Sequence, residues 1–306
     1  MAKFFREGVN MLAFLFPGQG SQKVGMGKDL IEKTNIAQKI YNTAKEILGF
    51  DLLKLCLEGP EEELTKTENA QVAILTYSYI ANLILKEKGL KPDFVAGHSL
   101  GEFSAILSAE MIDFETALKL VRKRGELMAK ADPEGKGGMA AVLGLDSEKV
   151  IEICKEISKE KYVAPVNFNA PGQIVISGLK EGIDLAESEL KEAGAKRVLK
   201  LNVSGAFHSQ LMEKAAEEFK SYLETISFKK PICKVISNAT AGIIDETNVK
   251  ELLYKQMKSP VLWIDIVKLL KKEGVTTAIE VGYGNVISGL VNKIEPSITI
   301  RSFIEY

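Results

Sequence analysis

The sequence predicts an α/β protein with a mostly parallel sheet and a smaller α/β domain inserted into it. Over most of the 306 residues, short apolar runs alternate with helix-like stretches, the pattern of parallel strands joined by helices. Between residues 132 and 203 the order changes to strand, helix, two strands around a turn, helix and strand, which is the βαββαβ pattern of ferredoxin-like domains. We therefore expect a large domain made of residues 1–131 and 204–306, and a small domain made of residues 132–203.

The individual elements follow from apolar periodicity and from helix start and stop signals. Asp113 before an apolar-periodic stretch predicts a helix start, and Leu-Gly or Lys-Gly pairs predict helix ends. In the large domain we expect strands over residues 12–16, 93–96, 234–237, 278–281 and 298–302, and helices over residues 29–48, 70–88, 102–109, 113–129, 210–223, 248–257, 261–273 and 285–293. In the small domain we expect strands over residues 139–143, 163–167, 173–178 and 197–201, and helices over residues 147–158 and 181–193.

Composition narrows the class of protein. Hydrophobic residues make up 46% of the chain, charged residues make up 26%, and the net charge is −1, which is typical of a globular protein and argues against bulk binding of nucleic acid. No apolar run approaches the ~20 residues of a membrane span. Cys56, Cys154 and Cys233 are far apart and form no metal-binding or redox pair. We therefore expect a cytoplasmic protein with free thiols, no metal, and neither nucleic acid nor membrane as a partner.

A candidate nucleophile lies in Gly97-His98-Ser99-Leu100-Gly101, which matches the G-x-S-x-G turn. The apolar run before it predicts a strand and the residues after it predict a helix, so the motif has the strand–turn–helix context that it requires. Glycine on either side removes side chains that would clash in such a tight turn. The hydroxyl of Ser99 is then expected to stand exposed at the carboxyl end of the sheet.

A serine nucleophile needs a base, and the chain has two histidines. His98 directly precedes Ser99, and successive side chains at a strand end point opposite ways, so we expect His98 to be a packed, hydrogen-bonded structural residue. His208 is therefore the candidate base. The order of serine before histidine is that of the α/β-hydrolases, so the large domain is expected to be α/β-hydrolase-like. We expect the site to lie in a cleft between the two domains.

The segment Pro17-Gly18-Gln19-Gly20-Ser21-Gln22 follows the first strand. A dinucleotide fingerprint would need glycine where Lys23 stands, and a phosphate-binding loop ending at Lys28 would need glycine at position 22, so neither nucleotide motif fits. The loop fits better beside the elbow, where Gln19 and Leu100 would supply two backbone amides to a developing oxyanion. A tight turn without a ligand remains the alternative.

Arg124 lies near the buried apolar stripe of the helix predicted over residues 113–129. A buried guanidinium needs an acidic partner, and a substrate carboxylate would suit its planar fork. The competing interpretation of the whole site is a serine hydrolase such as a thioesterase, which would have no use for a buried arginine. A non-catalytic module that docks a carrier protein would lack the nucleophile or the base.

Together these motifs resemble the malonyl-CoA:acyl-carrier-protein transacylases of fatty-acid synthesis, nearly from end to end. The resemblance rests on residues 16–22, 97–102, 124–125, 165–169, 205–209 and 280–282. It implies that malonyl-CoA acylates Ser99, and that the malonyl group then passes to the phosphopantetheine thiol of holo acyl carrier protein, without a permanently bound cofactor. The fold of that family is the α/β-hydrolase-like domain with a ferredoxin-like insert predicted above.

The resemblance also implies a role for each matching site residue. His208 is the general base and later the general acid in a dyad with Ser99. The other implied roles belong to Arg124 (malonyl carboxylate), Gln19 and Leu100 (oxyanion amides), Gln256 (backbone carbonyl that orients the imidazole), Gln71 (lining of the site), and Asn169 and Arg197 (positions of the small domain that face the cleft).

Two further features concern specificity and docking. Ala206-Phe207 precedes the histidine, as in the malonyl-selecting form of polyketide-synthase acyltransferases, and a bulky Phe207 would crowd an α-methyl branch. Acyl carrier proteins are acidic, so a basic rim is expected. Its candidates are Lys191, Lys196, Arg197 and Lys200 near the last strand of the small domain, and Lys268, Lys271 and Lys272 on a late helix; ordinary solvated lysines are an equally good interpretation.

Overall fold

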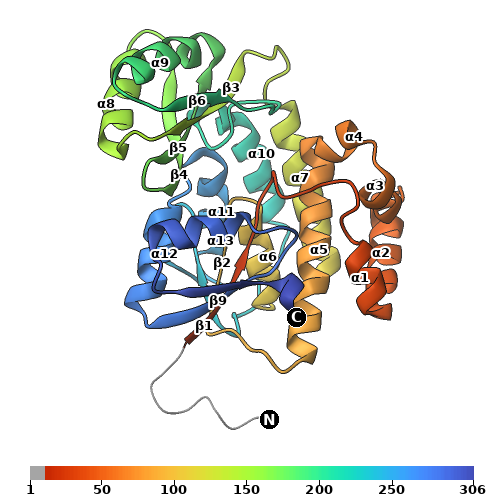
Figure 1. Cartoon of the computed structure of the whole chain (residues 1–306). Helices are drawn as coiled ribbons and strands as arrows, with labels where there is room; N and C mark the ends of the chain where they lie inside the picture. Colours follow the sequence, from red (N-terminus) through yellow and green to blue (C-terminus); the bar gives the residue numbers. More distant parts are fainter. Residues whose placement is uncertain (1–10) are drawn as a thin grey trace.

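Two sheets organise residues 11–306, the part of the chain that the computed structural model describes (Figure 1). Residues 1–10 of the predicted large domain lie outside the described residues. The larger sheet has the strand order β10-β9-β1-β2-β7-β8, and its strands pair in parallel except for β7 with β8. Its strands are β1 (Met11–Phe16), β2 (Phe94–Gly97), β7 (Lys234–Ile236), β8 (Ile243–Ile244), β9 (Val275–Glu280) and β10 (Thr299–Ser302). The predicted α/β class with a parallel-sheet core is confirmed.

The second sheet has four strands in the order β4-β5-β3-β6, all antiparallel, and lies above the parallel sheet in Figure 1. Its elements are β3 (Gly137–Leu143), α8 (Ser147–Ile157), β4 (Val163–Ala170), β5 (Gln173–Leu179), α9 (Lys180–Glu192) and β6 (Arg197–Lys200). Side chains of α8 and α9 pack on this sheet in an apolar core of their own, which includes Val142, Val150 and Leu190.

Helices surround the parallel sheet. They are α1 (Lys28–Lys33), α2 (Asn35–Leu48), α3 (Leu52–Glu58), α4 (Glu61–Thr65), α5 (Thr67–Glu87), α6 (Gly101–Ser108), α7 (Phe114–Lys130), α10 (Glu213–Leu223), α11 (Val249–Lys258), α12 (Trp263–Lys272) and α13 (Val286–Ile294), with short 3-10 turns at Gln210–Met212 and Phe303–Glu305. No helix within residues 11–306 is long and apolar enough to cross a membrane.

The single helix predicted over residues 29–48 is wrong, because the chain breaks at Thr34. This residue is extended, with φ −155°, and its hydroxyl accepts a hydrogen bond from Ile36 N at 3.2 Å, which caps α2. Gly49 ends α2 in the left-handed region, as the Leu-Gly stop signal predicts. The short helices α3 and α4 and the strand β8 were not expected from the sequence.

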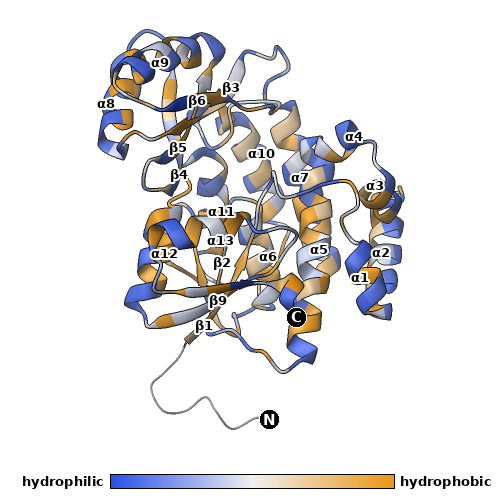
Figure 2. Ribbon diagram, in the orientation of Figure 1, coloured by the Kyte–Doolittle hydropathy of each residue, from blue (hydrophilic) through white to orange (hydrophobic). Residues whose placement is uncertain are grey.

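The two helices that carry part of the site, α5 and α7, pack closely together. Most residues of α5 are buried, and Figure 2 shows this helix coloured mainly as hydrophobic residues, whereas α2 and α8 carry many hydrophilic ones. Asp113 caps α7, as predicted, through a 2.8 Å bond from Thr116 N. A Cβ at Gly125 would lie 2.6 Å from Glu68 Cα, so glycine permits the close approach that brings α7 against the start of α5.

The antiparallel sheet is hydrogen-bonded to the rest of the molecule through β4. Phe168 N donates to Val261 O at 3.0 Å, and Val261 N donates to Val166 O at 2.7 Å. These bonds hold the end of β4 beside the segment that precedes α12, at the side of the parallel sheet where β2 ends.

Candidate active site

The predicted turn of strand, serine and helix is present between β2 and α6. Ser99 has φ +50°, in the left-handed region that is costly for a residue with a side chain. A Cβ at Gly97 would lie 2.0 Å from the carbonyl carbon of Gly101, and a Cβ at Gly101 would lie 2.2 Å from Phe16 O. Both flanking positions therefore require glycine for steric reasons, as the motif predicts.

Both ring nitrogens of His208 lie within hydrogen-bond distance of a polar group. Ser99 Oγ lies 2.7 Å from His208 Nε2, and His208 Nδ1 lies 2.8 Å from the backbone oxygen of Gln256. Because a carbonyl oxygen only accepts, Nδ1 carries the proton in the neutral ring and Nε2 is free to accept the proton of the Ser99 hydroxyl. Burial, together with the positive charge of Arg124, lowers the pKa of His208 to about 3, so the ring is a neutral base at pH 7.

Arg124 is fully buried beside the dyad. Its Nη1 donates to Gln71 Oε1 at 2.8 Å, and its Nη2 donates to Gln256 Oε1 at 2.9 Å and to Ser99 Oγ at 3.3 Å. Burial lowers the pKa of Arg124 to about 10, which still leaves it cationic at neutral pH. Within residues 11–306 it has no ion pair, and Nε has no hydrogen-bond partner. Arg124 thus places a buried cation 3.3 Å from Ser99 Oγ, with no carboxylate paired to it in the described part of the chain, an arrangement that favours an anionic ligand.

The two predicted oxyanion donors, Gln19 and Leu100, come from the loop after β1 and from the turn into α6. A Cβ at Gly18 would lie 2.3 Å from His98 O, so the loop that carries Gln19 rests directly against the elbow. The Gln19 side chain bonds Thr67 Oγ1 at 3.3 Å, and Leu100 begins the turn into α6. Within the described part of the chain, neither backbone N–H, of Gln19 or of Leu100, donates to an acceptor.

His98 points away from the dyad, as expected for a structural residue. Its Nε2 donates to Asn169 Oδ1 at 2.7 Å, and its ring meets the edge of Trp263 with the centroids 5.7 Å apart. Burial lowers the pKa of His98, so this ring is also neutral at pH 7. Asn169, at the end of β4, therefore reaches the elbow. Arg197 does not: it is exposed on the edge strand β6, with no hydrogen bond to the dyad among residues 11–306.

Two buried polar residues of the site, Glu102 and Asn238, were missed by the sequence analysis. Glu102 Oε2 accepts from Gln256 Nε2 at 2.8 Å and from Asn238 N at 3.2 Å, and burial raises its pKa to about 7. Asn238 bonds the backbone of the elbow on both sides of His98. The available signals were a lone carboxylate in the otherwise apolar helix after the elbow, and an amide directly after a central strand.

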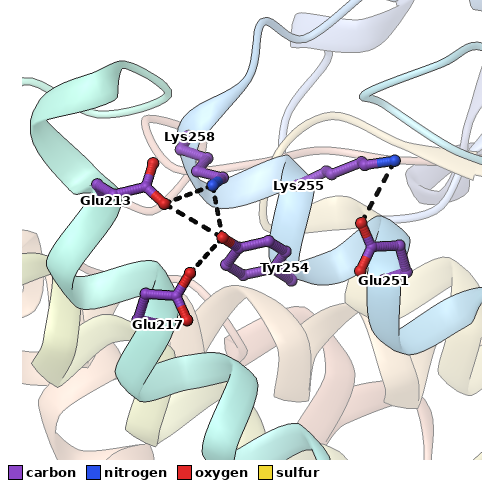
Figure 3. Close-up of polar contacts among 6 residues, drawn as sticks. All are labelled: Glu213, Glu217, Glu251, Tyr254, Lys255 and Lys258. Atoms are coloured by element: carbon purple, nitrogen blue, oxygen red, sulfur yellow. Dashed lines mark hydrogen bonds and ion pairs between the residues drawn. The ribbon is translucent and has the colours of Figure 1, made fainter.

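A polar cluster on the surface ties the two segments that hold the imidazole. Helix α10 follows the His208 loop and α11 carries Gln256. Figure 3 shows Lys258 and Tyr254 of α11 meeting Glu213 and Glu217 of α10. Lys258 Nζ lies 2.6 Å from Glu213 Oε1, and Tyr254 OH bonds both carboxylates. The cluster thus fixes α10 against α11 outside the buried site.

One cavity lies outside the dyad. A cavity of about 270 Å³ is lined by residues of the α7–β3 connection and of the segment before α10, among them Asp132, Ala206 and Met212, and its lining does not include Ser99. Within residues 11–306, no group of three or more His, Cys, Asp or Glu side chains is arranged to hold a metal ion.

The geometry is that expected of a serine acyl-transfer site, and the comparisons with known proteins give the family of the chain. Residues 13–291 match the acyl transferase domain family. The malonyl CoA-acyl carrier protein transacylase of Bacillus subtilis is 48% identical over 94% of this chain and 91% of that protein, and that of Staphylococcus aureus strain MW2 is 46% identical over 95% and 94%. The chain belongs to this family of malonyl CoA-acyl carrier protein transacylases.

Solved structures agree with this assignment. The acyl-carrier-protein S-malonyltransferase of Burkholderia pseudomallei superimposes with a TM-score of 0.93 at 41% identity, over 96% of each chain. A malonyl-transacylase in complex with a type II PKS acyl-carrier protein gives a TM-score of 0.93 at 41% identity, over 95% of each chain.

Proposed function

We propose that this protein transfers a malonyl group from malonyl-CoA to the phosphopantetheine thiol of holo acyl carrier protein, through a malonyl ester of Ser99. The relatives are named for this transfer, and one similar structure is a complex with an acyl-carrier protein. The observation that carries the proposal is the 2.7 Å contact between Ser99 Oγ and His208 Nε2 beside the fully buried guanidinium of Arg124.

In the first half-reaction, Ser99 Oγ attacks the thioester carbonyl carbon while its proton passes to His208 Nε2. The bond from Nδ1 to the Gln256 oxygen stabilises the imidazolium that forms. The negative charge on the carbonyl oxygen is met by the backbone amides of Gln19 and Leu100, and losing one such donor typically costs ~100–1,000-fold in rate. When the tetrahedral intermediate collapses, the coenzyme A sulfur leaves and takes the proton from Nε2.

The second half-reaction reverses these steps with a different thiol. His208 Nε2 accepts the proton of the phosphopantetheine S–H, and the sulfur attacks the carbonyl carbon of malonyl-Ser99. Collapse breaks the ester bond, and Ser99 Oγ recovers its proton from Nε2. Water must be excluded for transfer to win over hydrolysis, and the nearly complete burial of His208 is consistent with that requirement.

Arg124 is proposed to bind the free carboxylate of the malonyl group. Gln71 and Gln256 fix the plane of its guanidinium through Nη1 and Nη2, while Nε remains without a partner. This arrangement favours transfer of a dicarboxylic thioester over a thioesterase acting on uncharged acyl chains. That the bulky Phe207 side chain makes the enzyme select malonyl over methylmalonyl remains a prediction. The Phe207 side chain is buried in the main core beside His208.

We further propose that residues 132–203 form a ferredoxin-like domain inserted between residues 1–131 and 204–306. The strand order β4-β5-β3-β6 and the separate core under α8 and α9 support this division. The carrier protein would approach the same domain, where Asn169 reaches the elbow and Arg197 is exposed. On the predicted basic rim, Lys191 and Lys200 pair with Glu187, which weakens the case for a strongly positive surface.

The free cysteines suit a reducing compartment, so we keep the cytoplasm as the proposed location. We also propose that the reaction uses malonyl-CoA as a substrate without a permanently bound cofactor. All the groups that the two half-reactions need come from the residues described above.

Intact-mass analysis after mixing with malonyl-CoA, acetyl-CoA and methylmalonyl-CoA tests the proposal. The wild type should gain a malonyl adduct, Ser99→Ala should gain none, and Ser104→Ala, which changes a buried serine of α6, should label like the wild type. A malonyl adduct that forms on Ser99→Ala, or a wild type that never labels, would refute the function proposed here.

A further inference from the structure

The central strand β2 runs past the end of its neighbour β7. Pairing of the two parallel strands is recorded for Phe94 with Lys234 and for Val95 with Val235, after which β7 ends at Ile236. Beyond that point the backbone of residues 97–99 still needs partners, because buried N–H and C=O groups are rarely left unpaired. These residues form the elbow that presents the serine.

The side-chain amide of Asn238 supplies those partners. Its Oδ1 accepts from Ser99 N at 2.6 Å, and its Nδ2 donates to Gly97 O at 2.6 Å. The two backbone groups flank His98. In a parallel ladder, a residue of the neighbouring strand bonds the C=O before and the N–H after the residue opposite it. The amide of Asn238 therefore makes the pair of bonds that one more residue of β7 would make.

We propose that Asn238 is a positioning residue for the nucleophile: its side-chain amide replaces the missing peptide unit of β7 and holds Ser99 in the left-handed conformation. This inference rests on the proposed function, in which Ser99 is the acylated residue. A backbone at φ +50° persists only when its surroundings hold it from several sides. The bond to Ser99 N is one of these constraints.

The second constraint acts on the other peptide group of Ser99. Gln256 Nε2 donates to Ser99 O at 2.8 Å and also to Glu102 Oε2 at 2.8 Å. The same Glu102 oxygen accepts from Asn238 N, and Asn238 O accepts from Leu262 N at 3.0 Å. The side chains of Asn238 and Gln256 thus hold the N–H and the C=O of Ser99. The Asn238 backbone N–H and the Gln256 side chain both donate to one buried carboxylate, that of Glu102. This convergence directs Oγ toward His208.

A comparison of Asn238→Ala with Asn82→Ala separates an effect on the position of Ser99 from an effect on the stability of the fold. Asn82 is as buried as Asn238, and its Oδ1 accepts from Ser108 Oγ at 2.8 Å, toward the far end of α5. In single-turnover labelling with malonyl-CoA, Asn238→Ala should acylate Ser99 about 10- to 100-fold more slowly at unchanged half-saturation, since small misplacements of reacting groups carry costs of that order. Asn82→Ala should lower the melting temperature but keep the rate. Equal acylation rates for the two variants would overturn the inference.

Asn238→Asp gives a second readout that does not require the alanine variant to fold. An ionised carboxylate repels Gly97 O, whereas the protonated carboxyl can donate to Gly97 O and accept from Ser99 N. The ratio of variant to wild-type acylation rates should therefore rise as the pH falls from about 9 to about 5, through the range in which a buried carboxyl takes up its proton. The other titratable groups around the elbow are present in both proteins: Glu102, His98, His208 and Arg124. Their titration therefore cancels in the ratio of variant to wild-type rates. A ratio that does not change with pH would refute the positioning role, whereas failure of the proposed function would appear as absent labelling of the wild type.

Discussion

Removal of the Arg124 side chain tests the proposed carboxylate-binding role directly. In the structure the guanidinium is fully buried, is held by two glutamines, and has no ion pair among residues 11–306. A malonyl carboxylate would therefore form a buried, charge-assisted pair with it. Truncating one partner of such a pair costs about 2–5 kcal/mol. At about 1.36 kcal/mol per tenfold, kcat/KM for malonyl-CoA should fall roughly 30- to 5,000-fold in Arg124→Ala.

Acetyl-CoA lacks the carboxylate, so its transfer should survive or increase in the same variant. The quantity to measure is the ratio of kcat/KM values for malonyl-CoA and acetyl-CoA, because the loss of bonds to Gln71 and Gln256 affects both substrates. Arg122→Ala is the matched control on the same helix, since Arg122 pairs with Glu126 at 2.7 Å and bonds Asn69. The ratio for Arg124→Lys should lie between those for Arg124→Ala and Arg122→Ala, because lysine keeps the positive charge but loses the planar, two-pronged guanidinium. An equal loss for both acyl groups would refute the reasoning.

Two further predictions concern the dyad and the elbow. Because burial lowers the pKa of His208 from 6.5 to about 3, the rate of Ser99 acylation should stay level from about pH 8 to about pH 5 and fall only as the pH approaches that folded value. Stopped-flow labelling across this pH range measures the acylation rate, and a rate that falls to half near pH 6.5 would contradict the prediction. Because the unfolded chain binds a proton on His208 more tightly than the folded protein does, this residue destabilises the folded state increasingly as the pH falls below 6.5. Gly101→Ala should lower the melting temperature and abolish transfer, because its Cβ would lie 2.2 Å from Phe16 O, whereas Gly289→Ala, with nothing within 4 Å, should be neutral or stabilising; an active Gly101→Ala enzyme would count against the elbow geometry.

The proposed nucleophile and its proposed base could be predicted from the sequence because their signals are local. The elbow has a steric signature of two glycines around a serine between a strand and a helix, and the chain offers only two histidines. The cap at Asp113 likewise acts on its immediate surroundings. These features are set by the covalent geometry of a few neighbouring residues, so spacing and residue type were sufficient.

The missed features depend on distant segments meeting. Thr34 occurs within a stretch whose apolar spacing is helical throughout, and only its extended backbone separates α1 from α2. Nothing in the spacing of Glu102, Asn238 and Gln256 indicates that three elements bring them together behind the serine. Arg197 was matched to a family position that faces the cleft; it is exposed on the edge strand β6, and its role stays a prediction.

Gln256 explains how a buried cation can remain open to an anion while a buried carboxylate is near. Its side chain lies between the two charges, donating to Glu102 through Nε2 and accepting from Arg124 through Oε1. Direct pairing of Glu102 with Arg124 would satisfy the guanidinium and leave little attraction for a substrate carboxylate. The intervening amide lets Glu102 moderate the charge of Arg124 without occupying its free N–H. Because the backbone oxygen of the same residue orients His208, the groups proposed for specificity and for proton transfer are set by one turn of α11.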